Sequence, residues 1–480
     1  MNATDPKYNA SELERLHLDS NHIRQLAETL LSASATTDFN QQTKLIDPEY
    51  QPILQELIDA LNELHPADMA TLLESLPIRE RLLIWNLASP EEDGEVLLEV
   101  SDPVRETLIE NMEQQELLAA VDDLDADELA ELAPDLPNNV VYEALSSRDE
   151  EERAQVAAAM SFEDDQVGAL MDFELVSIRA DVTCEVVLRY LRRFDSLPDH
   201  TDKIFVVDEH DVLQGILPIR SLLVADPDWL VSEIMVNDVV TFRPEDNTEE
   251  AAAAFERYDL VTAPVVDAHH KLIGRITVDE MVDVIREESE ADMLNMAGLK
   301  EEEDLFAPVA DSVKNRWVWL AVNLCTAFLA SRVIGMFEGS IEKIVALATL
   351  MPIVAGIGGN SGNQTITMIV RAMTSGQISN NQAWRLLRKE EGVAIVNGLL
   401  WGSVMGIISY LLYHSIGIGL VMVAAMTLNL LLAATVGVMI PVVMQKLGRD
   451  PALGSSVLIT AVTDSGGFFI FLGLATLFLL

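Results

Sequence analysis

Hydrophobic positions are unevenly distributed along this chain, and they separate a polar first part from a second part made of long apolar runs. Five apolar stretches are each long enough to cross a bilayer, which takes about 20 helical residues. They occupy residues 317–337, 341–373, 392–413, 419–443 and 455–480. The pattern therefore predicts a transmembrane domain of five α-helices over residues 313–480.

The polar part begins with a helical pattern. Short amphipathic segments over residues 51–160 end repeatedly in Leu-Pro, and LHPADMATLLESLP returns as LDADELAELAPDLP about sixty residues later. Such a repeat is typical of stacked helical hairpins. We expect an acidic, all-α superhelical domain over residues 46–165. Residues 1–45 are polar, have no sustained periodicity and are expected to form a loosely ordered segment.

The hydrophobic period changes after residue 166. Two successive segments of about sixty residues each follow the order strand, helix, strand, turn, strand, helix. This internal repeat predicts a tandem α/β pair over residues 166–285. The acidic segment that follows predicts a connecting helix over residues 286–312. The predicted fold class is multidomain, with an all-α domain, an α/β pair, a connecting helix and a helical membrane domain.

Charge is divided as unevenly as hydrophobicity. From Val313 onward the chain has ten Lys or Arg and six Asp or Glu, a net charge of +4. The preceding part therefore holds 21 basic and 72 acidic residues, a net charge of −51. Nucleic-acid binding requires a basic surface and is not expected. A domain this acidic repels itself unless counterions bind to it.

The two cysteines and the amino terminus bear on the compartment. Cys184 and Cys325 are too few for a disulfide framework, which favours a reducing environment for the polar part. The first residues, MNATDPKYNASELERL, lack the basic start and apolar run of a secretory signal, so we expect none.

Short loops of the membrane domain carry an asymmetric charge. Basic residues precede the first span and lie between the second and third spans and between the fourth and fifth; the alternate loops hold only Lys343. Because Lys and Arg are enriched on the cytoplasmic side, we expect a cytosolic amino terminus and an outward-facing carboxyl terminus. The expected location is a bacterial cytoplasmic (inner) membrane, crossed several times, with the lipid bilayer as a partner.

Asp464 is the principal candidate for chemistry, because it lies inside the last apolar stretch with no Lys or Arg to pair with. A carboxylate at membrane depth is costly and typically faces a water-filled path or a partner. The second stretch is also polar at its centre: GIGGNSGNQT follows Pro352. We expect irregular backbone there, buried in protein or lining a cavity. Uncharged oxygens plus one carboxylate suit a hard, hydrated cation.

The tandem α/β pair resembles a pair of CBS domains. The resemblance rests on FVVDEHDVLQGILPI in the first copy and PVVDAHHKLIGRIT in the second. CBS pairs often bind adenine nucleotides through a Thr or Ser and a later Asp. Thr277 matches the first of these, whereas Asp279 and Glu280 depart from the usual spacing of the second. ATP at the CBS pair is a secondary expectation.

The order of domains, with GGNSGNQ in the second span and TDSGGF in the fifth, resembles the MgtE family of magnesium channels and transporters. The resemblance covers nearly the whole chain beyond the first forty or so residues. It implies a homodimer with a pore between the two membrane domains. It also implies that the pore opens at low cytosolic Mg²⁺ and closes when Mg²⁺ binds among the acidic domains.

The resemblance assigns residues to two sites. The pore and its ion-selective site would be formed by Asp464, Thr460, Asn363, Thr367, Gly356 and Ser456, with Asp464 as the ion-site carboxylate. Ser456 and the following Val457 depart from the residues common in the family. The Mg²⁺ ligands of the cytosolic sensor would be Glu95, Asp127, Glu131, Glu249, Glu280, Asp283, Glu288 and Asp292. Several are Glu where relatives have Asp, which lengthens their reach.

Three functions remain open from the sequence. The first is a magnesium-selective channel or transporter shut by cytosolic Mg²⁺. The second is an ion-coupled carrier of Mg²⁺, Mn²⁺ or Co²⁺, although the oxygen-rich lining without Cys or His disfavours softer metals. The third is a membrane-tethered CBS sensor without transport, which would need neither Asp464 nor a polar second span. An enzyme is not expected, because the sequence has no P-loop or nucleophile elbow.

Overall fold

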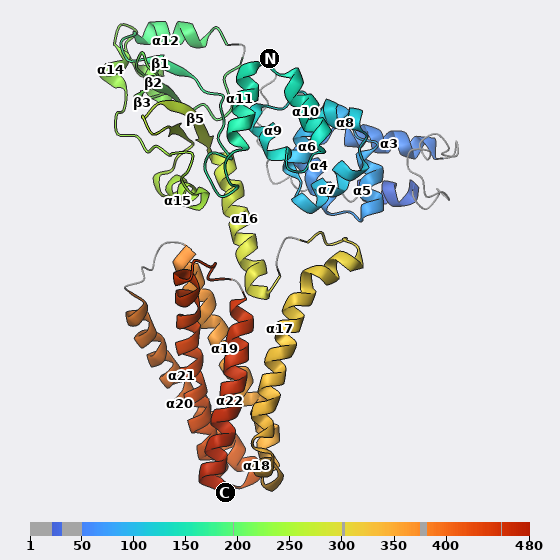
Figure 1. Cartoon of the computed structure of the whole chain (residues 1–480), viewed down its shortest axis with the longest axis vertical. Coiled ribbons are helices and arrows are strands. Elements are labelled where there is room, and N and C mark those ends of the chain that lie inside the picture. The colour runs from blue at the N-terminus through green and yellow to red at the C-terminus, as the bar shows by residue number, and fades with distance from the viewer. Residues whose placement is uncertain (1–21, 31–49, 195, 300–302, 375–381, 453) are drawn as a thin grey trace. The chain divides into compact units, whose positions relative to one another are not determined.

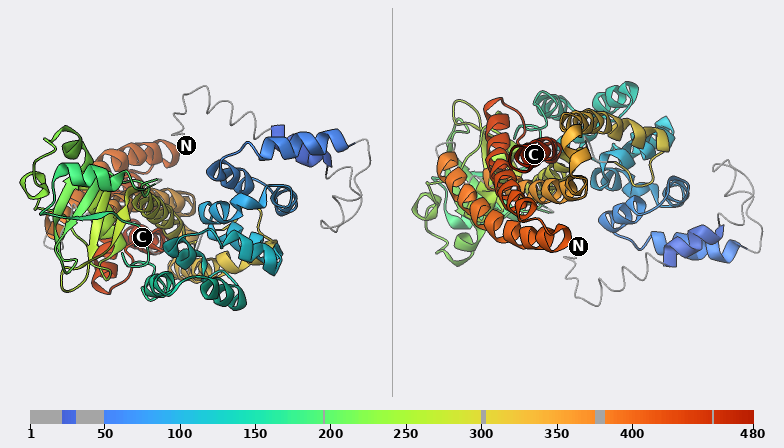
Figure 2. Two further views of the ribbon diagram at one scale, coloured as in Figure 1. Left: turned by 90° about the horizontal axis from the view of Figure 1, so that it is seen from above. Right: turned by 90° about the horizontal axis from the view of Figure 1, so that it is seen from below.

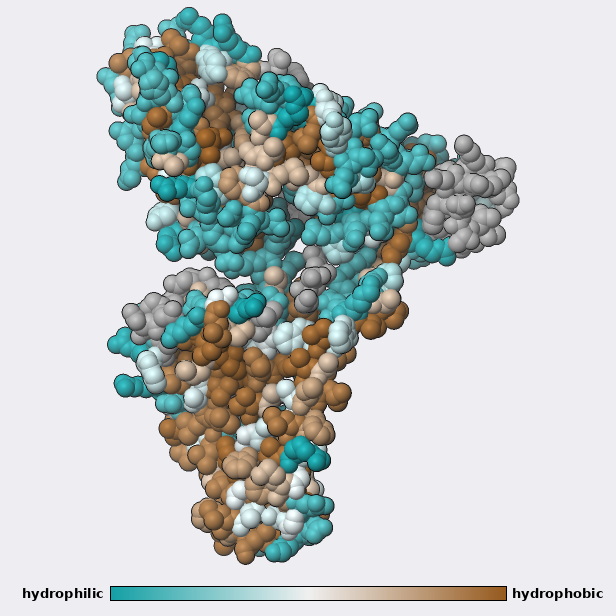
Figure 3. Space-filling model, viewed as in Figure 1, coloured by the Kyte–Doolittle hydropathy of each residue, from teal (hydrophilic) through white to brown (hydrophobic). Residues whose placement is uncertain are grey.

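The computed structural model describes residues 22–30, 50–194, 196–299, 303–374, 382–452 and 454–480 (Figure 1). The chain divides into two compact units. The N-terminal unit comprises Met1–Glu287 with Asp304–Ala307, and the C-terminal unit comprises Glu288–Glu303 with Pro308–Leu480. In the face drawn in Figure 3, hydrophilic residues predominate on the N-terminal unit and hydrophobic residues on the C-terminal unit.

Short helices build the first domain of the N-terminal unit. They are α3 (Gln51–Leu61), α4 (Pro66–Glu74), α5 (Ile78–Trp85), η1 (Pro90–Glu92), α6 (Asp93–Glu99), α7 (Asp102–Asn111), α8 (Gln114–Ala120), α9 (Ala126–Leu132), α10 (Asn138–Ser147) and α11 (Glu150–Ala159). Leu and Val side chains from successive helices form one continuous hydrophobic core. Pro at the first turns and acidic residues at the helix starts set the boundaries, as predicted for helical hairpins.

The expectation of a loosely ordered segment over residues 1–45 is wrong for residues 22–30. These residues are helical, and Ile23, Leu26, Ala27 and Leu30 are buried in the core of the helical domain. Their spacing of three, one and three residues forms one apolar helix face. The other residues of the predicted segment 1–45 lie outside the described residues.

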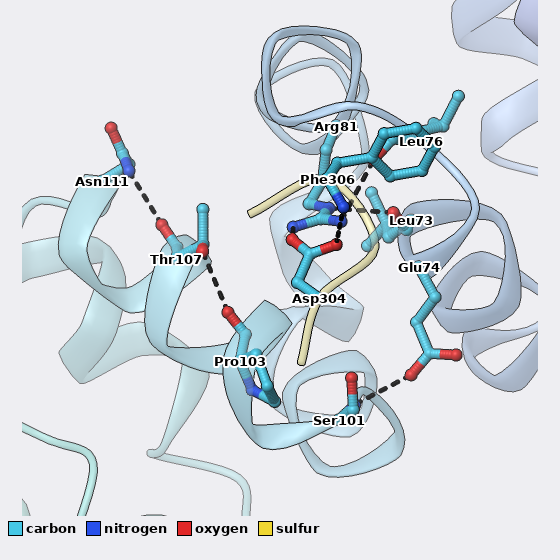
Figure 4. A network of polar contacts seen from close by, with 10 residues as sticks. All are labelled: Leu73, Glu74, Leu76, Arg81, Ser101, Pro103, Thr107, Asn111, Asp304 and Phe306. Atoms are coloured by element: carbon cyan, nitrogen blue, oxygen red, sulfur yellow. Dashed lines mark hydrogen bonds and ion pairs between the residues drawn. The ribbon is translucent and has the colours of Figure 1, made fainter. Parts of the chain in front are cut away.

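Two arginines occupy equivalent positions in successive hairpins. Arg81 Nε donates to Leu73 O at 2.9 Å, and Arg105 Nε donates to Leu97 O at 2.7 Å, so each ties down the end of the preceding helix. The remaining guanidinium nitrogens find different partners. Arg105 pairs with Glu131 at 2.8 Å, whereas Arg81 pairs with Asp304 at 2.6 Å (Figure 4). Asp304 therefore fixes the segment Asp304–Ala307 to the helical domain.

The second domain of the N-terminal unit contains the two predicted α/β copies. The first has β1 (Ser177–Arg179), α12 (Cys184–Leu191), β2 (Lys203–Val207), β3 (Leu213–Pro218), α13 (Ile219–Val224) and α14 (Val231–Ile234). The second has α15 (Thr248–Tyr258), β4 (Thr262–Val266), β5 (Leu272–Thr277) and α16 (Val278–Ala297). Strand β2 pairs in parallel with β1 and antiparallel with β3, and β4 pairs antiparallel with β5. The predicted first strand of the second copy is reduced to one bridge, from Phe242 to Val265.

The turns of the two copies confirm that they are repeats. Asp208 accepts hydrogen bonds from the backbone N–H of His210 and Val212, and Asp267 accepts them from His269 and Lys271 in the same way. The two turns also pair with each other, because Leu213 N donates to His270 O and Leu272 N to Asp211 O. A shared hydrophobic cluster of Phe205, Val207, Leu213, Val266 and Leu272 joins the copies.

The predicted boundary between the CBS pair and a connecting helix at residue 286 falls inside one helix. Helix α16 runs without interruption over Val278–Ala297, because no Gly or Pro interrupts it before Gly298. Residues 303–308 are not helical, so the connecting helix ends earlier than predicted.

The C-terminal unit is a bundle of long helices, seen from the end nearer the carboxyl terminus in the right-hand view of Figure 2. They are α17 (Val309–Gly335), the short α18 (Glu338–Lys343), α19 (Ala346–Thr374), α20 (Ala383–Tyr413), α21 (Ile416–Lys446) and α22 (Ser455–Leu479). Within the described residues, α17, α20, α21 and α22 are long and apolar enough to cross a membrane by length and composition. Helix α19 has the length, but its polar centre lowers its hydropathy.

The expectation of irregular backbone in the second span is wrong. Helix α19 is continuous over 29 residues and includes Pro352. A proline lacks only one intrahelical donor, and this one lies in the second turn of the helix. Of the four glycines that follow, Gly358, Gly359 and Gly362 pack directly against neighbouring helices, which stabilises the helical backbone there.

Candidate functional site

Glycines of the GIGGNSGN motif form a face of α19 that packs closely against α21 and α22. A Cβ at Gly358 would overlap Asn429 of α21, and a Cβ at Gly362 would overlap Ile459 of α22. A Cβ at Gly359 would lie 3.7 Å from Thr463 Oγ1. Small residues allow this close backbone approach between membrane helices. The glycine contacts therefore bring the motif of α19 against the TDSGG motif of α22.

The polar residues of α19 lie on a different side of the helix. Gly356, Asn360, Gln364 and Thr367 are exposed in the single chain, and Asn363 is partly buried. They follow one another at intervals of three or four residues and therefore lie along one face of the helix. An exposed polar row on a membrane helix is costly against lipid, so this face requires water or another protein surface.

Helix α22 carries a second polar row beside these contacts. Ser456, Thr460 and Asp464 follow one another at intervals of four residues, so they lie on one face. Thr460 is exposed, and Ser456 and Asp464 are partly buried. The Thr460 carbonyl accepts a hydrogen bond from Thr463 Oγ1 at 3.2 Å. The residues predicted to form the pore thus lie in two rows of oxygen atoms on two contacting helices.

Asn429 and Glu390 are among the buried polar residues of the bundle that were not predicted as site residues. Asn429 lies in the apolar helix α21 and is 1 % exposed. Glu390 of α20 is buried, with Oε2 3.5 Å from Thr365 Oγ1 of α19 and Oε1 2.9 Å from Lys389 Nζ. The spacing Leu387, Glu390, Ala394 puts this acid on a buried helix face, a signal that the sequence contained.

The last turns of α16 belong to the C-terminal unit and contact the beginning of α22. Asn295 Nδ2 donates to Asp450 Oδ2 at 2.9 Å, and Gly454 N donates to Asn295 O at 3.0 Å. Met296 packs in a cluster with Ile366 of α19 and Ile459 of α22. The connecting helix therefore ends against the same two helices that carry the polar rows.

A group of acidic residues lies between the helical domain and the CBS pair in the N-terminal unit. Burial raises the pKa of Glu280 in α16 to about 8, and the negative charges of Glu131, Asp279, Asp127 and Asp283 add to the effect. Burial also raises the pKa of Asp127 in α9 to about 7, with a further contribution from Asp172. These carboxyl groups are close enough to repel one another, so their common ionisation is unfavourable.

The repulsion extends along both elements. Burial and the charge of Asp283 raise the pKa of Glu99, and burial, Asp102 and Asp283 raise the pKa of Glu287. Three arginine side chains offset part of this repulsion between carboxylates. Arg105 pairs with Glu131, Arg275 pairs with Asp172 at 2.6 Å, and Arg286 pairs with Asp283 at 3.3 Å. Among the described residues no ion pair is formed by Glu280 or Asp127. These two carboxyl groups therefore form the centre of the acidic cluster.

The structure brings together five of the eight predicted sensor ligands. Glu95, Asp127, Glu131, Glu280 and Asp283 contribute to the mutual repulsion described above. Glu249 lies on the exposed first turn of α15, and Glu288 and Asp292 lie in the part of α16 that belongs to the C-terminal unit. Within the described residues, no three His, Cys, Asp or Glu side chains converge as a ready-made metal site. The acids are near one another but do not form a closed chelate.

Two further predicted or polar groups lie outside this cluster. Thr277, the candidate nucleotide ligand, ends β5 and is 4 % exposed. Asp93 lines a cavity of about 260 Å³ in the helical domain with Trp85 and Met69. Burial and the charge of Glu116 raise the pKa of Asp93 to about 7.

Comparisons with known proteins find relatives for several parts of this chain. The MgtE family, described as a divalent cation transporter, matches residues 351–474, its intracellular N domain matches residues 64–165, and the CBS domain matches residues 231–287. A magnesium transporter MgtE of Thermus thermophilus is 33 % identical over 446 residues, covering 89 % of this chain and 97 % of that protein. A magnesium transporter MgtE of Bacillus subtilis is 26 % identical and covers 89 % of this chain and 94 % of its own length.

Among solved structures, the cytosolic domain of the Mg²⁺ channel MgtE in complex with ATP is 34 % identical, with a TM-score of 0.44. It covers 49 % of this chain and 98 % of its own length. The three family matches follow one another along the chain as N domain, CBS domain and transporter domain, and the structure has its domains in the same order. The Thermus thermophilus relative is similar over nearly its whole length. This chain is a multi-pass membrane protein and belongs to the MgtE family.

Proposed function

We propose that this protein is a magnesium channel of the cytoplasmic membrane and that Mg²⁺ binding to its acidic N-terminal unit shuts it. The observation that carries the proposal is the pair of polar rows on α19 and α22, which ends in the carboxylate Asp464. The rows offer only oxygen ligands and one acid, which suit a hard cation that keeps most of its water. The names of the two long relatives support Mg²⁺ as the transported ion.

The exposed polar rows also support a homodimer. In a single chain, Gly356, Thr367 and Thr460 would face lipid. A second copy related by a two-fold axis would face the same rows across a shared, water-filled path. The pore would then have two Asp464 carboxylates, one from each chain. The basic loops support a cytosolic N-terminal unit and an outward carboxyl terminus.

Closure by Mg²⁺ follows from the electrostatics of the acidic cluster. With no cation present, Glu280, Asp127 and their neighbours repel one another and favour separation of the helical domain from the CBS pair. A bound divalent ion would offset this repulsion. The open cluster supports a largely hydrated ion, held by one or two carboxylates at a time. Because α16 carries Glu280 at one end and contacts α22 at the other, it is the element that would transmit the change.

Nucleotide binding at the CBS pair is a secondary part of the proposed function. The CBS pair has the predicted repeat, but Thr277 is almost fully buried. ATP would act as a modulator of the same acidic unit. Ion-coupled transport remains the alternative mechanism for the membrane domain.

The test is Mg²⁺ influx into liposomes that contain the purified protein. The internal free Mg²⁺ is held either in the micromolar range or near ten millimolar, with equal ionic strength. A channel shut by internal Mg²⁺ should conduct rapidly in the first condition and slowly in the second. Flux that depends on an imposed proton or sodium gradient would identify a coupled carrier. No Mg²⁺ flux in either condition would refute the proposed function.

A further inference from the structure

Asn429 is a buried carboxamide in an otherwise apolar helix. Helix α21 is apolar enough to cross a membrane, and Asn429 is 1 % exposed. Its Nδ2 donates a hydrogen bond to the carbonyl of Val354 in α19 at 2.9 Å. Its Oδ1 has no hydrogen-bond partner within the described residues. A polar group buried this deeply is unfavourable unless its hydrogen bonds are made.

The same amide nitrogen touches the backbones of two helices. A Cβ at Gly358 of α19 would overlap Asn429 Nδ2, and a Cβ at Gly467 of α22 would lie only 2.8 Å from it. Asn429 thus fills a notch that exists because both facing residues are glycines. It lies at a point where α19, α21 and α22 meet.

Both glycines lie within one helical turn of the polar rows. Gly358 is two residues from Gly356 and from Asn360, and Gly467 is three residues after Asp464. A displacement of either helix at the notch therefore moves the oxygen atoms of its row. Stability alone does not account for the carboxamide, since a Leu of similar volume would fill the notch without burying a polar group.

We propose that Asn429 is a positioning residue for the ion pathway. Its amide, held by the Val354 carbonyl and lodged between Gly358 and Gly467, sets the distance between α19 and α22. That distance determines how closely the row of α19 and the carboxylate of Asp464 approach a passing cation. The expected effect on ion flux rests on the proposed function, whereas the distance between α19 and α22 is a property of the helix bundle itself.

The first experiment compares ion flux in liposomes containing full-length variants. Asn429→Leu removes the hydrogen bond, and Gly358→Ala adds a methyl group where Nδ2 lies. Each should lower Mg²⁺ influx about ten-fold or more, because small misplacements of binding groups have large effects on rate. Each should also change the ratio of Mg²⁺ to Ca²⁺ flux. The control is Thr435→Val, because within the part of the chain that the structure describes Thr435 Oγ1 bonds only to Leu431 O of its own helix, at 2.8 Å.

The double variant Asn429→Ala with Gly358→Ala tests spacing directly. Its new methyl group occupies the volume that the amide vacated, so most of the lost influx and the original ion ratio should return. Recovery is a readout that a general loss of stability would not give. If Asn429→Leu does not fold, the comparison of the double variant with Gly358→Ala still tests the proposal. Single variants with wild-type flux and ion ratio, or a folded double variant without recovery, would overturn the proposal.

A second measurement does not depend on transport. Spin labels at Met368 of α19 and Leu458 of α22, both exposed, report the distance between the helices. Gly358→Ala should shift the measured distance distribution, and the double variant should restore it. Absence of Mg²⁺ flux in the wild type would refute the proposed function alone. An unchanged distance distribution in Gly358→Ala would refute the positioning role alone.

Discussion

In the proposed pore, the charge of Asp464 is the single-residue property most directly tied to ion flux. It is the one acid in α22 and ends the polar row begun by Ser456 and Thr460. Asp464→Asn keeps the shape of the side chain and removes its attraction for a cation. We expect Mg²⁺ influx into liposomes to fall at least about ten-fold, since a nearby unit charge contributes more than 1.4 kcal/mol for a divalent ion at reduced dielectric.

The matched control is Glu342→Gln. This substitution neutralises an exposed carboxylate of the short helix α18, away from both rows. Its influx should equal that of the wild type. Wild-type influx in Asp464→Asn, with normal folding, would remove Asp464 from the pathway.

Glu280 provides a residue-level test that depends on pH. Its pKa in the folded protein is about 8, above the ordinary value of 4.5, because of burial and neighbouring acids. Between these two values the folded protein holds a proton that the unfolded chain has released. The free energy of unfolding therefore decreases as pH rises through this window, and the loss is complete above about pH 8.

Glu280→Gln should abolish that decrease. In metal-free buffer at pH 8.5 the variant should be more stable than the wild type, on the order of 2 kcal/mol, and at pH 5 the two should be alike. Thermal unfolding of the full-length protein at both pH values measures this. Glu250→Gln, at an exposed acid of α15, is the control. A difference of the same size at both pH values would contradict the assigned pKa.

Single residues differ in how far the sequence alone could predict them. Asp464 was identifiable because a charge inside an apolar run is conspicuous. Asn429 was not, because a lone Asn in a membrane helix has the same local pattern whether it is buried or faces the surface. Its role depends on Gly358 and Gly467, which are 71 and 38 residues away. Glu390 was obscured by the charges beside it in RLLRKEEG.

At the scale of elements, the segment Asp304–Ala307 depends on one buried ion pair. Arg81 and Asp304 have side chains 0 % and 5 % exposed, and their atoms lie 2.6 Å apart (Figure 4). Asp304→Ala leaves the guanidinium buried without its counter-charge, which typically costs about 3–5 kcal/mol. We expect this variant to lower the unfolding midpoint of the helical domain and to increase protease cleavage near residue 304.

Asp311→Ala is the comparison for this ion pair. Asp311 pairs with Lys314 at 2.8 Å, but the two side chains are 54 % and 77 % exposed. Exposed pairs contribute little, so no measurable loss of stability is expected. Equal behaviour of the two variants would mean that Asp304 is not held by Arg81 in solution.

The elements themselves were largely predictable from periodicity. The long apolar helices and the tandem α/β repeat have strong patterns, and the predicted bounds of α21 and α22 match those observed within a few residues. Helix α20 begins at Ala383, well before the predicted start at residue 392, because its first turns are charged. Residues 22–30 were missed because one short apolar face is hidden among polar neighbours. The continuity of α19 was missed because Gly and Pro are poor helix formers in water, whereas in a bundle the packing of α21 and α22 decides the backbone.

At the scale of the whole molecule, the proposed closure by Mg²⁺ depends on the acidic N-terminal unit. Two effects of removing its carboxylates have opposite signs. Neutralisation relieves the repulsion that holds the acidic surfaces apart, which favours the compact state. It also removes the ligands through which an ion would link the helical domain to α16. An ion stabilises a state only through its differential affinity for that state.

We expect the loss of ion bridging to dominate, because a bound ion fixes a geometry whereas lower repulsion only permits it. Asp127→Asn with Glu280→Gln should therefore leave the channel conducting at internal Mg²⁺ concentrations that shut the wild type. Two neutralisations at exposed acids that are not assigned as ligands, Glu245→Gln with Glu250→Gln, test whether lower net charge alone has this effect. Influx is measured across a series of internal Mg²⁺ concentrations. The Mg²⁺ concentration that halves the influx should be at least about ten-fold higher in the Asp127→Asn, Glu280→Gln variant than in the wild type, because two ligands are lost. A double variant that is shut even at low Mg²⁺ would instead mean that repulsion between the acidic surfaces, and not bridging by the ion, keeps the channel under control.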